Sequence, residues 1–314
     1  MKKILFLVVI VSSLYSATIQ KADAKYISSG AVTDIVYKDS KLYSATDASC
    51  VDIFDVKSKE IIHKIKVSKI KDFMGDIIDS KVYSVDVIND KILILSQAQK
   101  GARRVHIYED DKLELIIPYT DKLFIAKAKF IDENTILLGL LSNEIISYDI
   151  KNRKQNYREA VSQSKFSNFA LNEDKSKVVV ADESGDLTML HTKDFSLIKQ
   201  LTGQNLDNVF QVDIKNGLVA TAGQDRRVVI YNSSSAYYKV TSFLIYSVGL
   251  SPSGKIVGYA SDEDNNVALF NTATKREIGL YGGNKMTISQ ILFINETEFF
   301  VSSDDKTINF YKIK

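Results

Sequence analysis

A large apolar residue recurs along this chain at intervals of about forty residues. The seven positions are Phe54, Tyr108, Tyr148, Leu190, Tyr231, Phe270 and Tyr311. Each lies in a short run in which apolar and polar residues alternate after a polar turn, as in a half-buried β-strand. A period near forty that is built from such runs is typical of a β-propeller with about four strands per blade.

Three turn signals in each period divide it into four strands. In the sixth unit, Leu250–Lys255 (LSPSGK) and Asp262–Asn266 (DEDNN) are two of the signals, and Asn271–Lys275 (NTATK) is the third. Gly, Asn, Asp and Pro favour such turns because they tolerate positive φ, preset φ or cap their own backbone. The sequence therefore predicts an all-β fold, a seven-bladed β-propeller with four antiparallel strands per blade.

The seventh unit ends at Lys314, directly after its third predicted strand. The natural donor of the missing outer strand is Thr18–Ser28, which precedes the first inner strand. We therefore expect the ring to be closed by an N-terminal strand, since closure removes two unpaired sheet edges.

The repeat units resemble WD40-type repeats over nearly all of the chain that follows the N-terminal segment. Ser303–Tyr311 (SDDKTINFY) is similar to the strand ending of that family, with Tyr311 at the position of the usual Trp. The chain has no Trp, and the Gly-His pair that begins such repeats is missing. The resemblance implies a platform for protein binding, but the hydrogen-bond network of that His and Trp is not carried over.

The N-terminus has the pattern of a secretory signal peptide. Two lysines precede the apolar run Ile4–Val11, which is too short to span a bilayer, and the small residues of Ser12–Ala17 follow. We expect residues 1–16 to be removed and residues 17–314 to form one propeller domain. The resulting protein is expected in a bacterial periplasm, as a monomer without a membrane span.

The charge balance argues against a nucleic-acid partner. The chain has 41 basic and 39 acidic residues, and removal of the leader takes away two lysines and no acid. The remaining protein is formally neutral, whereas nucleic-acid binders carry a basic stripe that neutralises phosphates.

Motifs for catalysis, metals and cofactors are weak. The three histidines, His63, His106 and His191, fall in different repeat units without the clustered ligands that zinc requires. Gly282–Met286 (GGNKM) lacks the spacing and the hydroxyl residue of a phosphate loop. The only cysteine, Cys50, is expected to be a buried thiol rather than an intermolecular link. We expect no enzyme activity and no cofactor; the alternative is a propeller hydrolase or lactonase with a hidden carboxylate site.

Acidic residues recur in the turns between second and third strands. They are Asp47, Asp182, Asp186, Asp225, Asp262, Asp264, Asp304 and Asp305. A ring of carboxylates could hold Ca²⁺. The simpler interpretation is that each Asp caps its own turn.

One insertion departs from the repeat. The interval from Phe54 to Tyr108 exceeds the others by about thirteen residues, which places an insertion at Ser68–Ser80 (SKIKDFMGDIIDS). Binding residues are often placed in loops that a scaffold does not need, and a second loop, Gln97–Arg104, lies near it. The candidate partner-binding residues are Lys69, Lys71, Asp72, Phe73, Met74, Asp76, Ile77, Ile78, Arg103 and Arg104. The alternative is that the insertion simply folds against the rim as a short helix or an extra strand.

The leader, length, composition and divergent repeats together resemble the NapL accessory proteins of periplasmic nitrate reductase systems. That resemblance implies a non-catalytic role in maturation or activity of the reductase, with the reductase or its electron-transfer components as partners. The chain has no C-x-x-C-H haem motif and no cysteine cluster for iron–sulfur. A second possibility is a scaffold for outer-membrane protein assembly, although the N-terminal Cys that anchors such lipoproteins is lacking.

Overall fold

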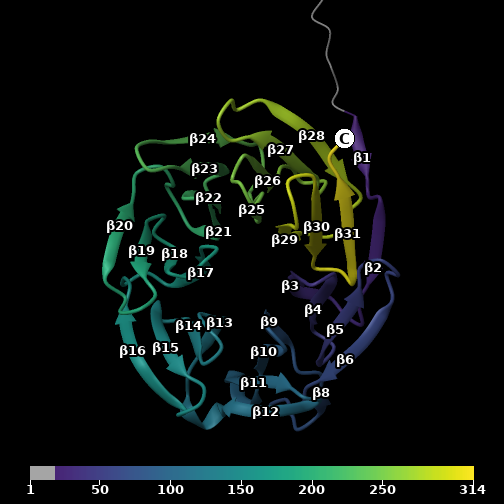
Figure 1. Cartoon of the computed structure of the whole chain (residues 1–314), viewed down its shortest axis with the longest axis vertical. Coiled ribbons are helices and arrows are strands. Elements are labelled where there is room, and N and C mark those ends of the chain that lie inside the picture. Colours follow the sequence, from purple (N-terminus) through teal and green to yellow (C-terminus); the bar gives the residue numbers. More distant parts are fainter. Residues whose placement is uncertain (1–17) are drawn as a thin grey trace, which may run out of the picture.

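The computed structural model describes residues 18–314 as seven antiparallel four-stranded sheets around a central axis (Figure 1). One of the sheets carries an additional parallel strand. The predicted all-β, seven-bladed propeller is therefore confirmed. The predicted signal peptide, residues 1–16, lies outside the described residues.

Each blade contributes one strand to each of four positions, counted outward from the axis. The inner strands are β3 (Val32–Lys38), β9 (Val82–Ile88), β13 (Ile125–Phe130), β17 (Phe166–Leu171), β21 (Val209–Lys215), β25 (Val248–Leu250) and β29 (Ile288–Phe293). The second strands are β4 (Lys41–Thr46), β10 (Lys91–Gln97), β14 (Thr135–Leu140), β18 (Lys177–Asp182), β22 (Leu218–Gly223), β26 (Ile256–Ala260) and β30 (Glu298–Ser303).

The recurrent apolar residues of the sequence all lie on the third strands. These are β5 (Cys50–Asp55), β11 (Arg103–Glu109), β15 (Glu144–Asp149), β19 (Leu187–His191), β23 (Arg227–Tyr231), β27 (Val267–Asn271) and β31 (Thr307–Lys312). The outer strands are β6 (Ile61–Lys66), β12 (Lys112–Ile117), β16 (Lys154–Ala160), β20 (Leu197–Leu201), β24 (Ala236–Val240), β28 (Glu277–Gly282) and β2 (Ala24–Ile27).

The N-terminal segment closes the ring with two strands rather than one. Strand β2 pairs antiparallel with β31 and completes the seventh blade, as predicted. Strand β1 (Ile19–Lys21), which precedes it, pairs in parallel with β28 of the sixth blade. Tyr26 of β2 is buried, and its hydroxyl donates a hydrogen bond to the carbonyl of Val56 in the first blade. The segment therefore connects three successive blades.

Four short elements lie outside this scheme. Strands β7 (Ile70–Lys71) and β8 (Ile77–Ile78) form a separate two-stranded sheet inside the insertion. Two 3₁₀ turns, η1 (Gln99–Gly101) and η2 (Tyr119–Asp121), lie in loops of the second and third blades. The insertion is thus a β-hairpin.

The hydrophobic core is divided among the junctions between blades. Seven clusters of buried side chains each combine residues of two neighbouring blades. At the second junction, for example, Leu93 of blade two packs with Phe130 and Tyr148 of blade three. Each blade alternates its side chains between two such junctions, so removal of one blade would expose two clusters.

A tyrosine, an asparagine and a threonine form a buried polar network in blade five. In blade five, the side-chain amide of Asn205 donates to the Tyr231 hydroxyl at 3.0 Å. The Thr221 hydroxyl donates to the Asn205 side chain at 2.8 Å. All three residues are buried. These hydrogen bonds therefore link β22 and β23 to the loop that precedes β21.

Candidate protein-binding face

The loops of the ring fall on two opposite faces because successive strands of a blade run antiparallel. Loops from second to third strands share one face with loops from each outer strand to the next inner strand. The insertion, residues 68–80, joins β6 to β9 and therefore lies on this face, which we call the insertion face. Loops from first to second and from third to fourth strands form the opposite face.

Exposed apolar side chains are distributed unequally between the two faces. The nine large ones at the insertion face are Phe73, Met74, Ile77, Ile78, Tyr119, Phe124, Leu141, Leu206 and Met286. Eight others, Ile19, Ile27, Ile62, Leu115, Tyr157, Leu197, Tyr238 and Val240, lie on outer strands or on β1. Within residues 18–314, no loop of the opposite face carries such a side chain. Contiguous exposed apolar surface marks interaction sites, whereas scattered apolar residues do not.

The hairpin of the insertion presents the most exposed apolar residues of this face. Its turn is held by Asp72, whose Oδ1 accepts hydrogen bonds from the backbone N–H groups of Met74 and Asp76, each at 2.9 Å. Gly75 has φ +94°, a backbone conformation that residues other than glycine rarely adopt. At the tip, Phe73 is 96% exposed and Met74 is 73% exposed. The turn chemistry therefore directs two large apolar side chains into solvent.

The base of the hairpin is fixed to the first two blades. Ile70 is only 5% exposed. The Ser49 hydroxyl donates to Asp79 at 2.8 Å, and the backbone N–H of Ser80 donates to the Ser49 Oγ at 2.7 Å. Lys69 forms an ion pair with Asp79 at 3.0 Å. The base of the hairpin is therefore fixed to the ring, while its tip is exposed to solvent.

A groove separates the hairpin from the turn that contains η1. Ile70, Phe73 and Ile78 line one side, and Ala98, Gln99 and Gly101 line the other. The cavity in the groove has a volume of about 610 Å³. The two segments that the sequence singled out, the insertion and the loop 97–104, therefore meet in one surface feature.

The candidate residues divide into two groups. Eight of them, Lys69, Lys71, Asp72, Phe73, Met74, Asp76, Ile77 and Ile78, lie together on the hairpin or its base. Arg103 instead stacks on the Tyr83 ring at 3.9 Å and donates to the carbonyl of Gly101 at 2.6 Å. Arg104 donates to Ser96 at 3.1 Å and to the carbonyl of Ser68. Burial lowers the pKa of both arginines. Arg104 thus contacts the base of the insertion, whereas Arg103 packs within blade two.

A set of polar side chains around the axis was not predicted from the sequence. At one register of the inner strands stand Asp34, Ser84, Lys127, Asn168, Gln211 and Gln290, while Ser247 directly precedes β25. In the sequence, this set is visible only as one polar residue that recurs at the same position in the inner strands. A single polar residue in a strand is common, so this recurrence does not by itself indicate a shared position around the axis.

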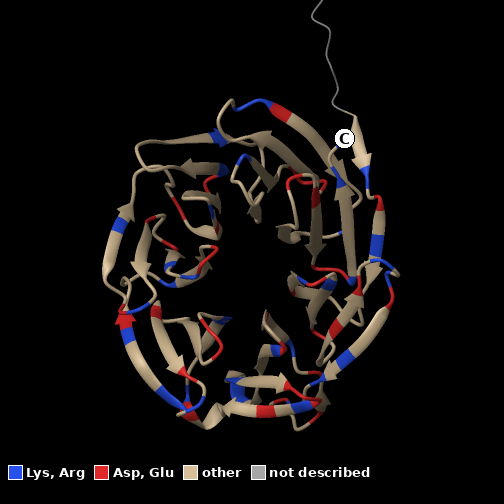
Figure 2. Cartoon of the chain, in the orientation of Figure 1, with Lys and Arg blue, Asp and Glu red and all other residues tan. Residues whose placement is uncertain are grey.

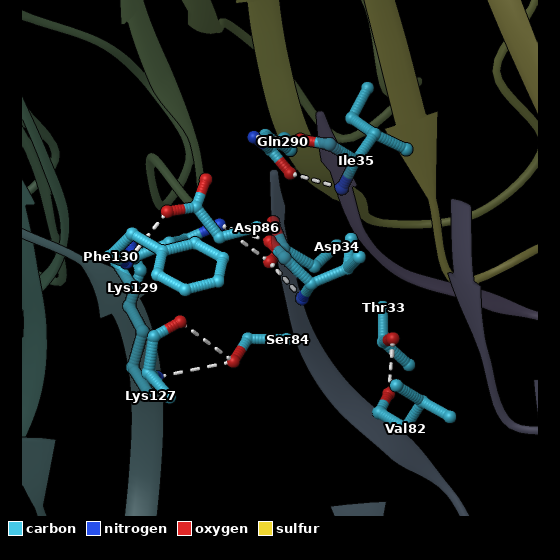
Figure 3. A network of polar contacts seen from close by, with 12 residues as sticks. Thr33, Asp34, Ile35, Val82, Ser84, Asp86, Lys127, Lys129, Phe130 and Gln290 are labelled. Carbon is cyan, nitrogen blue, oxygen red and sulfur yellow. Dashed lines mark hydrogen bonds and ion pairs between the residues drawn. The ribbon is translucent and has the colours of Figure 1, made fainter. Parts of the chain in front are cut away.

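Side chains of this set form hydrogen bonds with the unpaired backbone N–H and C=O groups of the inner strand in the next blade (Figure 3). Asp34 accepts from the Val85 N–H at 3.0 Å. The Ser84 hydroxyl accepts from the N–H of Ala128 at 3.1 Å. Gln290 accepts from the N–H of Ile35 at 2.9 Å and donates to its carbonyl at 3.0 Å.

Two more carboxylates, at a second register, cap backbone in the same way. Asp86 accepts from the Phe130 N–H at 2.7 Å (Figure 3), and Asp213 accepts from the Leu250 N–H at 2.9 Å. The carboxylates of this region are thus held by hydrogen bonds within the fold.

Two lysines of β13 face this central region. Lys129 forms an ion pair with Asp34 at 2.8 Å and donates to the Val85 carbonyl at 2.7 Å. Lys127 donates to the Asn168 side chain and to the Phe169 carbonyl, both at 2.8 Å. Burial, assisted by the positive charge of Lys129, lowers the pKa of Lys127 to about 8. A cavity of about 330 Å³ lies among these strands.

The remaining predicted features have local roles in the fold. Asp182 accepts hydrogen bonds from Asn143, Ser162 and Ser184, and Asp225 caps the backbone of Leu206. In the part of the chain that the structure describes, no three His, Cys, Asp or Glu side chains are grouped to hold a metal. Burial raises the pKa of the Cys50 thiol. Across residues 18–314, no helix has the length and apolar character required to cross a membrane.

Comparison with known proteins gives no relative: no protein-family model matches the chain, and no curated protein matches it.

Proposed function

We propose that this chain is a non-catalytic scaffold that binds a partner protein on its insertion face. One observation carries the proposal: the large exposed apolar side chains of the described loops all belong to that face. The hairpin tip contributes the largest concentration of them. The propeller fold is compatible with such a role, since it holds short loops on a rigid ring.

The energetics of the hairpin support this role. Burial of a fully exposed Phe or Met side chain contributes about 1.5–3 kcal/mol. Aromatic anchors near the centre of an interface dominate binding in most complexes. Phe73 lies on a turn that is preformed by Asp72 and Gly75, so little conformational entropy is lost when a partner covers it.

The finer proposal concerns the partner and the compartment. The resemblance to accessory proteins of periplasmic nitrate reductase makes that reductase, or its electron-transfer components, the partner that we propose. The N-terminal pattern of two lysines and an apolar run supports export to the periplasm.

Affinity capture tests the proposal. The chain is expressed in its own organism with its N-terminal leader and a C-terminal tag during growth on nitrate, and co-purifying proteins are quantified against an untagged strain. We expect enrichment of reductase subunits, and loss of that enrichment in a variant with Phe73→Ser and Met74→Ser. A matched variant, Leu197→Ser, removes an exposed apolar residue from the outer strand β20 and should retain the partner.

Other outcomes of the capture lead to different conclusions. Enrichment of outer-membrane assembly proteins would replace the nitrate reductase assignment but keep the scaffold. Equal capture by the wild type and by the hairpin variant would contradict the role of the insertion face. Turnover of lactones or phosphoesters by the purified chain would contradict the non-catalytic assignment.

A further inference from the structure

The groove beside the hairpin carries two lysines whose charges are not neutralised by the fold. Lys71 lies on the hairpin and Lys100 on the facing turn, and both line the groove. Both are exposed, and neither has an ion-pair partner within the described residues. Two positive charges therefore flank an apolar floor.

The acidic residues nearby are engaged or lie outside the groove. Asp72 also lines the groove, and its Oδ1 caps the hairpin turn through two backbone N–H groups. Asp79 is bound by Ser49 and Lys69, and these hydrogen bonds lower its pKa. Asp76 is exposed near the tip and does not line the groove. Lys71 and Lys100 therefore outnumber Asp72 among the charged residues that line the groove, which carries a net positive charge.

The other side of the insertion face has the opposite charge. Its loops over blades four to seven are residues 161–165, 183–186, 202–208, 224–226, 241–247, 261–266, 283–287 and 304–306. They hold nine acidic and four basic residues. The exposed carboxylates there without an ion pair in the described chain are Asp186, Asp207, Glu263, Asp264 and Asp304. Figure 2 shows the positions of the basic and acidic residues along the ribbon.

The hairpin also has unpaired backbone. Strands β7 and β8 pair only with each other, through Ile70 with Ile78 and Lys71 with Ile77. Each strand therefore keeps a free edge, and free sheet edges bind extended peptide segments through backbone hydrogen bonds. Residues of both strands, Ile70, Lys71 and Ile78, line the groove.

We propose that this groove binds an extended segment of the partner in which large apolar residues alternate with carboxylates. The apolar residues pack on Ile70, Phe73 and Ile78, and the carboxylates pair with Lys71 and Lys100. Blades four to seven repel the same segment, which confines it to the hairpin, since like-charge contacts disfavour wrong positions. This inference rests on the proposed function and adds the chemistry of the partner.

Binding of a defined peptide probe tests the groove. The probe is a fluorescein-labelled octapeptide in which glutamate alternates with leucine and phenylalanine. Its counterpart has lysine at every glutamate position. We expect the acidic peptide to increase its fluorescence anisotropy with the full mature chain, with an affinity that falls as salt is added. Absence of binding, or equal binding of both peptides, would overturn the proposal.

A charge-reversal variant assigns the binding to the two lysines. Lys71→Glu combined with Lys100→Glu should weaken binding of the acidic peptide about tenfold, since two attractions become repulsions. The matched control reverses Lys151 and Lys193, two exposed lysines in loops of the opposite face, and should bind as the wild type. Thermal unfolding of each variant confirms that it is folded. An unchanged affinity in the folded groove variant would overturn the proposal.

The outcomes separate this inference from the scaffold role. If partner capture depends on Phe73 and Met74 but not on Lys71 and Lys100, the groove proposal is wrong and the scaffold stands. If light scattering shows a dimer that the Phe73→Ser, Met74→Ser variant loses, the occupant is a second copy of the chain. That result would overturn the acidic segment as the ligand.

Discussion

Side chains of the inner strands supply hydrogen bonds that the backbone of those strands lacks. An inner strand pairs with a second strand on one side only, so half of its N–H and C=O groups face the axis. Gln290 satisfies both free groups of Ile35 across the junction between blades seven and one. This junction joins the two ends of the ring.

The contribution of Gln290 is measurable. Replacement by alanine leaves the N–H and C=O of Ile35 without their partner, and we expect a loss of about 1–3 kcal/mol in the free energy of unfolding. Urea unfolding measures it, with Gln224→Ala, at an exposed position, as the control. A variant as stable as the wild type would contradict the edge-capping role.

His106 makes stability depend on pH. The side chain is 8% exposed and its Nδ1 has no hydrogen-bond partner in the described structure. Burial, assisted by the charge of Arg104, lowers its pKa from 6.5 to about 4. Between these values the unfolded chain binds more protons than the folded one, so stability falls as the pH falls.

Replacement of His106 by leucine removes this dependence. From pH 6.5 to 4, the wild type should lose up to about 3 kcal/mol more of its free energy of unfolding than the variant does. The exposed His191, changed to leucine, is the control and should leave the slope unchanged. Parallel stability curves for the wild type and the His106 variant would contradict the assignment.

At the scale of residues, the sequence predicted the strand on which a side chain lies better than it predicted the groups which that side chain contacts. The seven recurrent residues were placed correctly on third strands because burial between blades leaves a strong apolar period. The polar register of Asp34, Ser84 and Gln290 was not predicted. Its partners are backbone groups of another blade, and no pattern within one strand specifies them.

At the scale of elements, the sequence predicted the closure of the ring by an N-terminal strand in more detail than it predicted the structure of the insertion. The N-terminal segment was expected to complete the seventh blade, and β2 does so. The parallel pairing of β1 with the sixth blade was not expected, because three residues carry too little pattern to indicate a partner strand. The length of the repeat locates the insertion, but the sequence is compatible with a short helix or an extra strand there, and the structure shows a two-stranded hairpin.

The hairpin tip and base should differ in their effect on stability. Phe73→Ser with Met74→Ser should change the free energy of unfolding by no more than about 0.5 kcal/mol, since both side chains are exposed. Ile70→Ser should lower it by about 2–4 kcal/mol, since Ile70 is buried. Thermal unfolding compares the two variants. A large loss of stability in the tip variant would show that the tip is core rather than contact surface.

At the scale of the whole molecule, the ring has one polar face and one face that exposes apolar side chains. The sequence predicted the ring, because a forty-residue period and its turns leave few other folds. It did not indicate which face binds. That distinction depends on Leu206 and Met286 sharing a face with Phe73, and only the course of all seven blades shows it.

Site-specific photo-crosslinking in living cells tests the binding face most directly. The photoreactive residue p-benzoylphenylalanine replaces Phe73 in one strain and Lys151, on the opposite face, in another. We predict a light-dependent adduct with a partner protein from position 73 and none from position 151. An adduct from position 151 with none from position 73 would contradict binding through the insertion face.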